Sequence, residues 1–326
     1  MALFELADYE DDLSFESFKY CRFLNMTNYK EIIEFYKLQY NENFSPFYHT
    51  LPAYNSICGD SRFRYRLFTI NNDRVFVAFE IVQIVTTKQI RIIGYPISET
   101  ENTDNEKLIL LKLLELDFVR VAMAEKLFGD LSYDRCFTYD DYFIDLSQYN
   151  FNCKFKSKYG ITKLLKNSDF EIHLFVGNDS SKFVPKLVQL YDTWEFGMDM
   201  DGHEVSSENR KTFIKFLLSD RTEVVKIILC YKNIPISLQL LLIDPVLKVQ
   251  DLLYIVHWGR RGIDAPDVKT IFNSLSEIQV YLLKYALDKQ VLLNNIVYIA
   301  GCRPTEKRLL KHKQNISTGC ITYGIS

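Results

Sequence analysis

Hydrophobic spacing in the second half of the chain predicts a run of strands interrupted by helices. Residues 223–233 and 234–244 are rich in Val, Ile and Leu and meet at a Lys-Asn pair, which predicts an antiparallel hairpin. Residues 247–258 predict a third strand, and the apolar residues of 268–290 recur at helical spacing. The pattern then predicts a buried strand, a basic helix and a final strand over 294–301, 305–315 and 320–326.

The first half repeats this order of elements. The pattern predicts, in turn, a hairpin (64–73 and 74–85), a third strand (88–97), a helix (104–115), a buried strand (118–124), a short helix (125–131) and a closing strand (140–146). A unit of more than ~100 residues that occurs twice indicates duplicated domains rather than a solenoid. We therefore expect an α/β protein with domains 1–150 and 151–326, each a mixed, mostly antiparallel sheet flanked by helices.

Helical sequence precedes each predicted sheet. It covers 28–39 in the first half, and 182–196 and 206–220 in the second. A lysine-rich stretch at 150–175 separates the two halves and ends in a strand-like run. We expect this stretch to be the crossover from one domain to the next.

The composition is that of a globular protein, and the charge is distributed unequally between the two halves of the chain. The 326 residues are 48 % hydrophobic and 25 % charged, which is enough to bury two cores. The net charge of −3 hides an asymmetry, because residues 1–150 carry 15 basic and 24 acidic residues and residues 151–326 carry 24 and 18. This predicts an anionic ligand or partner for the second half. Charge drift between domains with no role is the alternative.

Several protein classes lose support at this stage. No apolar run reaches the ~20 residues of a membrane span, and the N-terminus is acidic where a secretory signal is basic and then apolar. The seven cysteines are scattered singly and form no paired metal motif, so we expect a reduced, cytoplasmic setting and no bound metal. Signatures of serine hydrolases, P-loop enzymes, Rossmann dehydrogenases and zinc proteases are absent.

The loop 257–268 is the candidate binding site for an anion. It follows the third predicted strand and precedes the long predicted helix, and it contains Gly259, Arg260, Arg261 and Gly262. Glycine backbone, cations and a helix N-terminus are what a phosphate group needs. A solvated turn with both arginines in surface ion pairs is the alternative. The matching loop of the first half, 94–106, has four acidic residues and no basic one, so we expect a donor to bind the second domain only.

Two basic clusters accompany this loop. One contains Lys154, Lys156, Lys158, Lys163 and Lys166, with aromatic neighbours, and fits either a nucleic-acid backbone (tRNA or DNA) or a solvated helix face. The other contains Arg303, Lys307, Arg308, Lys311 and Lys313. We assign Arg303 to the same anion-binding site as the loop.

The third predicted strand of the second half offers groups for proton transfer. Asp251, Tyr254 and His257 are spaced by three, and an unbroken strand puts Asp251 and His257 on one face and Tyr254 on the other. His257 is a candidate general base because an imidazole titrates near neutral pH. A structural histidine with satisfied hydrogen bonds is the alternative.

An acidic loop at 194–205 follows the first predicted helix of the second half. It gathers Glu195, Asp199, Asp201, His203 and Glu204. The spacing lacks the distal carboxylate of a calcium loop, and one histidine without a nearby cysteine does not make a zinc site. The acids instead favour an ammonium group, with a plain polar loop as the alternative.

The order of elements resembles the GNAT acyltransferase fold, and its duplication resembles the Fem-type aminoacyltransferases. Four motifs carry the resemblance: Ile144-Asp145-Leu146-Ser147, the basic stretch from Lys154 to Lys166, Arg210 with Phe213, and Gly301 followed by Leu309, His312, Lys313 and Ile316. His312 stands where the family has Phe or Tyr. The loop 257–268 departs from the family's acetyl-CoA signature, and the chain has no room for the long helical arm of the peptidoglycan-building members.

The resemblance implies two tandem GNAT-like domains that transfer an acyl or aminoacyl group to an amine or a hydroxyl. The cosubstrate would be an aminoacyl-tRNA or an acyl-CoA, with no permanently bound cofactor. Its donor would bind at 259–262, Lys313 would steady the polarised carbonyl or a phosphate, and Glu195, Asp199, Asp201 and Tyr254 would line the acceptor side. Two alternatives stay open: a nucleic-acid base-modifying transferase that binds the polymer through 154–166, and a binding protein that has lost transfer.

Overall fold

The computed structural model describes residues 12–24, 51–58, 63–84, 86–93, 96–121, 137–148, 168–200, 207–245, 248–258, 266–273, 275–299 and 307–325. The chain divides into two compact units. Unit 1 comprises Met1–Asp141, Gly301–Arg303 and Ile321–Ser326, and unit 2 comprises Tyr142–Ala300 and Pro304–Cys320. The predicted domain boundary at 150/151 lies outside the described residues, as do the helices predicted at 28–39 and 125–131.

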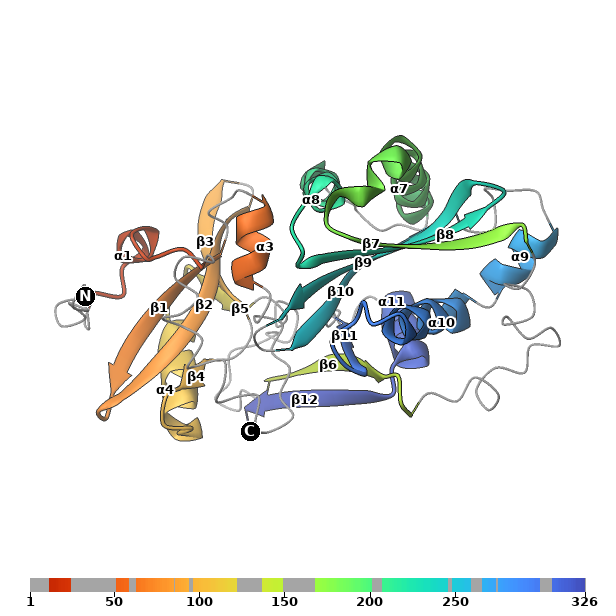
Figure 1. The fold of residues 1–326 in the computed structure, drawn as a ribbon. Coiled ribbons are helices and arrows are strands. Elements are labelled where there is room, and N and C mark those ends of the chain that lie inside the picture. The colour runs from red at the N-terminus through yellow and green to blue at the C-terminus, as the bar shows by residue number, and fades with distance from the viewer. Residues whose placement is uncertain are drawn as a thin grey trace. The chain divides into compact units, whose positions relative to one another are not determined.

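Unit 2 is built on a seven-stranded sheet with the strand order β12-β6-β11-β10-β9-β8-β7 (Figure 1). The strands are β6 (Phe137–Asp145), β7 (Phe170–Val176), β8 (Val224–Tyr231), β9 (Ile234–Asp244), β10 (Val249–His257), β11 (Ile296–Ile299) and β12 (Gly319–Ile325). Strands β7 to β10 pair antiparallel in sequence, and β10 pairs with β11 in parallel. A sheet that is mixed and mostly antiparallel is what the sequence predicts.

Helices cover both faces of this sheet. Helices α7 (Val184–Met200) and α8 (Ser207–Leu218), together with the short 3-10 helix at Asn178–Phe183, lie on one face. Helices α9 (Pro266–Asn273), α10 (Leu275–Asp288) and α11 (Lys307–Ile316) lie on the other. Each helical layer buries its own apolar cluster against alternate residues of the strands, so we call the two sides the α7/α8 face and the α10/α11 face.

The position of β6 differs from the prediction, which made this segment the closing strand of the first domain. In the structure it pairs antiparallel with β11, from Ile296 opposite Asp145 to Ile299 opposite Tyr142. Tyr142 and Ile144 lie on one face of β6, with Phe143 between them on the other, and pack into the apolar cluster of the α10/α11 face. Their burial in unit 2 is the physical reason for the pairing.

Unit 1 contains a five-stranded sheet in which β1, β2, β3 and β5 follow one another and β4 pairs with β2. Its elements are α1 (Phe15–Lys19), α3 (Leu51–Cys58), β1 (Phe63–Ile70), β2 (Asp73–Ile84), β3 (Thr87–Ile92), β4 (Ile97–Ser98), α4 (Thr103–Leu114) and β5 (Val119–Val121). Hairpin, third strand, helix and parallel strand thus recur in the order of unit 2. The predicted α/β class, with mixed sheets flanked by helices, is confirmed.

Two-residue turns form both predicted hairpins. Asn71 and Asn72 join β1 to β2 with φ of 52° and 64°, and Lys232 and Asn233 join β8 to β9 with φ of 48° and 64°. Positive φ at both central residues is the type I′ geometry that matches the strand twist, and Asn tolerates it better than most residues.

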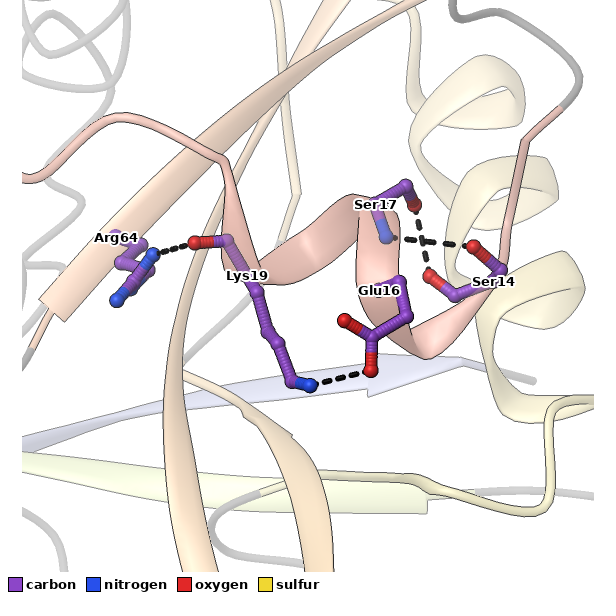
Figure 2. A network of polar contacts seen from close by, with 5 residues as sticks. All are labelled: Ser14, Glu16, Ser17, Lys19 and Arg64. Atoms are coloured by element: carbon purple, nitrogen blue, oxygen red, sulfur yellow. Dashed lines mark hydrogen bonds and ion pairs between the residues drawn. The ribbon is translucent and has the colours of Figure 1, made fainter.

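Helix α1 shows how local hydrogen bonds fix a short element in unit 1. Ser14 caps it, because its side chain accepts a hydrogen bond from the Ser17 backbone amide at 3.3 Å while Ser17 Oγ donates to the Ser14 carbonyl at 2.8 Å (Figure 2). Glu16 and Lys19 form an ion pair, and Arg64 of β1 donates to the Lys19 carbonyl. The helix is thereby tied to β1 even though it is a single turn and a half.

Candidate functional site

Unit 2 brings several of the candidate residues to the C-terminal end of β10. This strand keeps its partner β9 as far as His257, which lies opposite Ser237. Its described pairing with β11 covers only Asp251 opposite Tyr298 and Leu252 opposite Ile299. Among the described residues, the last residues of β10 pair with β9 on one edge, and no described strand pairs with them on the other edge.

A β-bulge shortly before this end decides which way the side chains point. The register with β9 shifts between Leu252 and Tyr254. Leu252 and Ile255 pack in the cluster of the α10/α11 face, whereas Tyr254 and Val256 pack in that of the α7/α8 face. An extra residue reverses the alternation, and bulges are frequent beside active sites.

The prediction that Asp251 and His257 share a face is therefore wrong. Before the bulge, Asp251 alternates with Leu252 and lies on the α7/α8 face; after it, His257 alternates with Val256 and lies on the α10/α11 face. Tyr254 shares its face with Asp251. Asp251 is buried, with 4 % of its surface exposed.

Among the predicted site residues that the structure describes, His257 has the most strongly shifted pKa. Burial, with a smaller contribution from the nearby His312, lowers its pKa from 6.5 to about 4. His312 of α11 also has a lowered pKa, first through burial and then through the positive charge of Lys313. At neutral pH both imidazoles are uncharged, so each can accept a hydrogen bond or a proton.

Helix α11 supplies the residues His312 and Lys313. Leu309, His312, Lys313 and Ile316 have the i, i+3, i+4, i+7 spacing of one helix face, and Ile316 is fully buried in the core of the α10/α11 face. Lys313 is also buried, with only 8 % of its surface exposed. Sequence reasoning noted His312 only as a replacement for an aromatic residue, although its helical spacing with Lys313 already placed both on the inward face.

On the α7/α8 face, Tyr254 belongs to an aromatic group. Its ring meets that of Phe213 edge to face at 5.4 Å, and Phe213 stacks on Tyr191 at 4.2 Å. Burial raises the pKa of Tyr191, and the carboxylate of Glu195 raises it further. Glu195 therefore lies near this aromatic group, half-buried on α7.

Helix α7 extends further than predicted and changes the acceptor-side candidates. It runs to Met200, so Glu195 and Asp199 are helical residues four apart, which puts them on the same helix face, rather than members of a loop. The side chain of Asp199 and the whole of Asp201 lie outside the described residues. The motif residue Arg210 forms a two-bonded ion pair with Asp192, at 2.7 and 3.0 Å.

Ten of the predicted site residues are not described, and their roles stay predictions. Apart from Asp201, they are the anion-binding candidates and the lysines assigned to nucleic acid: Gly259, Arg260, Arg261, Gly262, Arg303, Lys154, Lys156, Lys158 and Lys163. Helix α9 begins at Pro266, so the last three residues of the predicted loop 257–268 are helical.

The corresponding region of unit 1 already fills its helix N-terminus with the chain's own oxygens. The Asn102 side chain accepts from the amides of Asp104 and Asn105 at 3.1 and 3.2 Å, and Glu106 accepts from the Ser98 amide at 2.8 Å. Asp73 accepts from Ser98 Oγ at 2.7 Å and Asn105 Nδ2 at 2.9 Å. An anion entering here would meet carboxylates instead of amides.

No helix in the described part of the chain is long and apolar enough to cross a membrane. Within the same residues, no group of three or more His, Cys, Asp or Glu side chains is placed to hold a metal ion.

Comparisons with known proteins give a likeness in structure. No family model matches the chain, and no curated protein matches it either. Among solved structures, it is similar to L-PGS from Bacillus licheniformis (11 % identity, TM-score 0.46, covering 87 % of this chain and 81 % of that one). It is also similar to the C-terminal domain of a proposed lysylphosphatidylglycerol synthetase from Agrobacterium fabrum (10 %, 0.43, 88 % and 84 %). A third is a GCN5-related N-acetyltransferase-like protein from Streptococcus suis (11 %, 0.34, 90 % and 98 %). At these identities and TM-scores the likeness assigns neither a reaction nor a ligand to this chain.

Proposed function

We propose that the chain is a transferase that moves an acyl or aminoacyl group from an anionic donor to an amine or hydroxyl acceptor, with the chemistry in unit 2. One observation carries the proposal: uncharged His257 ends β10 just beyond a bulge, and α11 brings His312 close to it. The order of strands and helices around this point is that of the GNAT fold, which the sequence resembles.

The acceptor nucleophile attacks the acyl carbonyl, and the donor leaves as a thiol or a hydroxyl once it has taken up a proton. His257 accepts the proton that the nucleophile loses. A pKa of about 4 makes it a weak base, so positioning of the two substrates supplies most of the rate. The Lys313 ammonium stabilises the oxyanion or a donor phosphate.

The donor binds in unit 2 through Gly259, Arg260, Arg261, Gly262 and Arg303, as an aminoacyl-tRNA or an acyl-CoA. The basic second half of the chain supports this assignment, as does the carboxylate-filled helix start of α4 in unit 1. Unit 1 would then serve the acceptor side or support the fold. Glu195 and Tyr254 lie on the α7/α8 face and His257 on the α10/α11 face, so we do not assign these two predicted acceptor residues to the acceptor that reaches His257.

The double variant Arg260→Ala/Arg261→Ala tests the donor site. We expect loss of donor binding with an unchanged melting curve, measured by titration with acyl-CoA and with aminoacyl-tRNA. The matched control is Lys182→Ala/Lys186→Ala, which removes two exposed lysines of unit 2 and should keep donor affinity. Unchanged donor affinity in the arginine variant would refute the site.

An oligonucleotide arm of the same titration separates the alternative functions. Binding of generic nucleic acid that weakens steeply with salt and is lost on replacing Lys154, Lys156, Lys158 and Lys163 favours the base-modifying transferase. A chain that binds none of the three ligands and transfers nothing is not a transferase.

A further inference from the structure

Strand β7 forms one edge of the seven-stranded sheet of unit 2, with β8 on one side and no described strand on the other (Figure 1). Its register with β8 runs without a bulge over Phe170–Val176. The Gly177 amide donates to the Val224 carbonyl at 3.1 Å and continues this ladder. The odd-numbered residues of β7 therefore turn their backbone groups toward β8, and the even-numbered residues turn theirs outward, where no described residue pairs with them.

This edge lacks the features that usually protect an edge strand. Natural edges carry lysine, proline or a bulge, whereas β7 reads Phe-Glu-Ile-His-Leu-Phe-Val, with Glu171 as its single acid. The edge strand β1 of unit 1 is partly covered, because Leu24 donates to the Phe63 carbonyl at 2.9 Å and Tyr65 donates to the Arg22 carbonyl at 3.0 Å. A regular edge without protection is typical of a strand that pairs with another chain.

Apolar side chains accompany the open edge on both faces of the sheet. Phe170, Ile172 and Leu174 pack against the cluster of the α10/α11 face, and Phe175 packs against that of the α7/α8 face. Val176, at the end of the strand, is 43 % exposed. A second strand at this edge would therefore bury apolar surface in addition to completing the ladder.

We propose that the outer edge of β7 is an interface between two copies of this chain, paired antiparallel about a twofold axis at His173. In this register Phe170 lies opposite Val176 of the second copy, and Ile172 lies opposite Leu174. All four turn their backbone groups outward, so they form the hydrogen-bonded pairs of the new ladder. The pairing uses up the edge in both copies, so association stops at two. The interface does not depend on the transfer reaction.

The charges beside the edge support a second copy as the occupant. Glu171 lies opposite Phe175 of the second copy, so the two carboxylates do not face each other. Phe175 lies 5.8 Å from Phe183 of the 3-10 helix, and Lys182 Nζ lies 4.9 Å from the centre of the Phe183 ring. Each Glu171 thus meets the side of the sheet on which the other copy carries Lys182, and the twofold axis makes this contact twice.

Sedimentation velocity of the full chain from ~1 to ~200 μM tests the interface. We expect a reversible equilibrium between monomer and dimer. Val176→Pro removes an outward amide that the fold of one copy does not use, and should weaken the dimer by about tenfold or more. Val176→Thr keeps the amide and is the matched control. Trp194 and Trp258, the two tryptophans of the sequence, both lie in unit 2, so fluorescence melts show whether that unit folds in each variant.

Charge reversal tests the register and keeps the test open should Val176→Pro fail to fold. Glu171 and Lys182 are both exposed. Glu171→Lys and Lys182→Glu each bring like charges together across the interface, and we expect each to weaken the dimer about fivefold. The double variant exchanges the two charges and should restore it. Asp117→Lys, at an exposed position of unit 1, should leave the dimer unchanged.

Several results would overturn the interface. A chain that stays monomeric over the whole range has no second copy at β7, and particles that grow without limit are not a closed twofold dimer. A dimer that forms equally well in Val176→Pro, once this variant is shown to fold, uses another surface. Single charge reversals without effect, or a double variant no stronger than the single ones, contradict the pairing about His173.

Discussion

Replacing His257 by Gln tests whether the end of β10 holds an imidazole that resists protonation. In the folded protein the pKa is about 4, against 6.5 for an exposed histidine. The unfolded chain therefore binds more protons between these values, and the free energy of unfolding falls as the pH drops from 6.5 toward 4. Above pH 6.5 the imidazole is neutral in both states and contributes no pH dependence.

The size of the effect follows from the two pKa values. Between pH 7 and pH 5 the linkage relation gives a loss of about 2 kcal/mol from His257 alone. Part of the His257 side chain is exposed to solvent, which screens the charge, so this is the largest loss that we expect. Other titrating groups act in the wild type and the variant alike, so their contribution cancels in the difference.

Urea denaturation followed by tryptophan fluorescence at pH 7 and pH 5 measures this difference for unit 2. We expect His257→Gln to lose about 2 kcal/mol less than the wild type on acidification, and His257→Phe to behave in the same way because it also removes the titration. An identical pH dependence in wild type and both variants would refute the argument that burial and His312 keep this imidazole uncharged. An activity profile whose acid limb lies near pH 6.5 rather than near pH 4 would count equally against it.

Two further predictions concern the hydrogen bond between Lys226 and the Gly177 carbonyl in unit 2. Lys226 is fully buried, donates to the carbonyls of Gly177 and Ser219 at 2.9 and 3.0 Å, and has a pKa lowered by burial to about 8. The unfolded chain keeps this proton up to higher pH, so stability should rise by about 1.5 kcal/mol between pH 8 and 9.5 in the wild type and not in Lys226→Met; urea melts that rise equally in both would contradict this. Gly177 has φ of 74°, and a Cβ there would lie 2.7 Å from the Asp220 carbonyl oxygen. Gly177→Ala should therefore destabilise unit 2 by about 1–3 kcal/mol, and a melt that matches the wild type would show that the loop relaxes freely.

Most helices and strands could be predicted from the amino-acid sequence, because the signals for them are local. Strand alternation and the Asn-Asn and Lys-Asn pairs marked both hairpins, and the helical spacing of Leu309, His312, Lys313 and Ile316 defined the inward face of α11. The difference in anion binding between the two halves could also be predicted from the sequence, since a loop with four acidic residues and no basic one does not attract a phosphate. The structure adds that Asp73 and Glu106 accept the backbone amides and side-chain donors at this helix start.

Tertiary structure decided how these elements meet. One extra residue between Leu252 and Tyr254 turned His257 to the opposite face from Asp251, and such a bulge depends on the register with β9, which no local pattern encodes. The pairing of β6 with β11 and the approach of His312 to His257 join residues far apart in sequence. Burial then lowered the pKa of His257, because desolvation arises only when the core closes around a side chain. The order of residues thus specifies which chemical groups the chain carries, and packing specifies which of them lie close together and in what charge state.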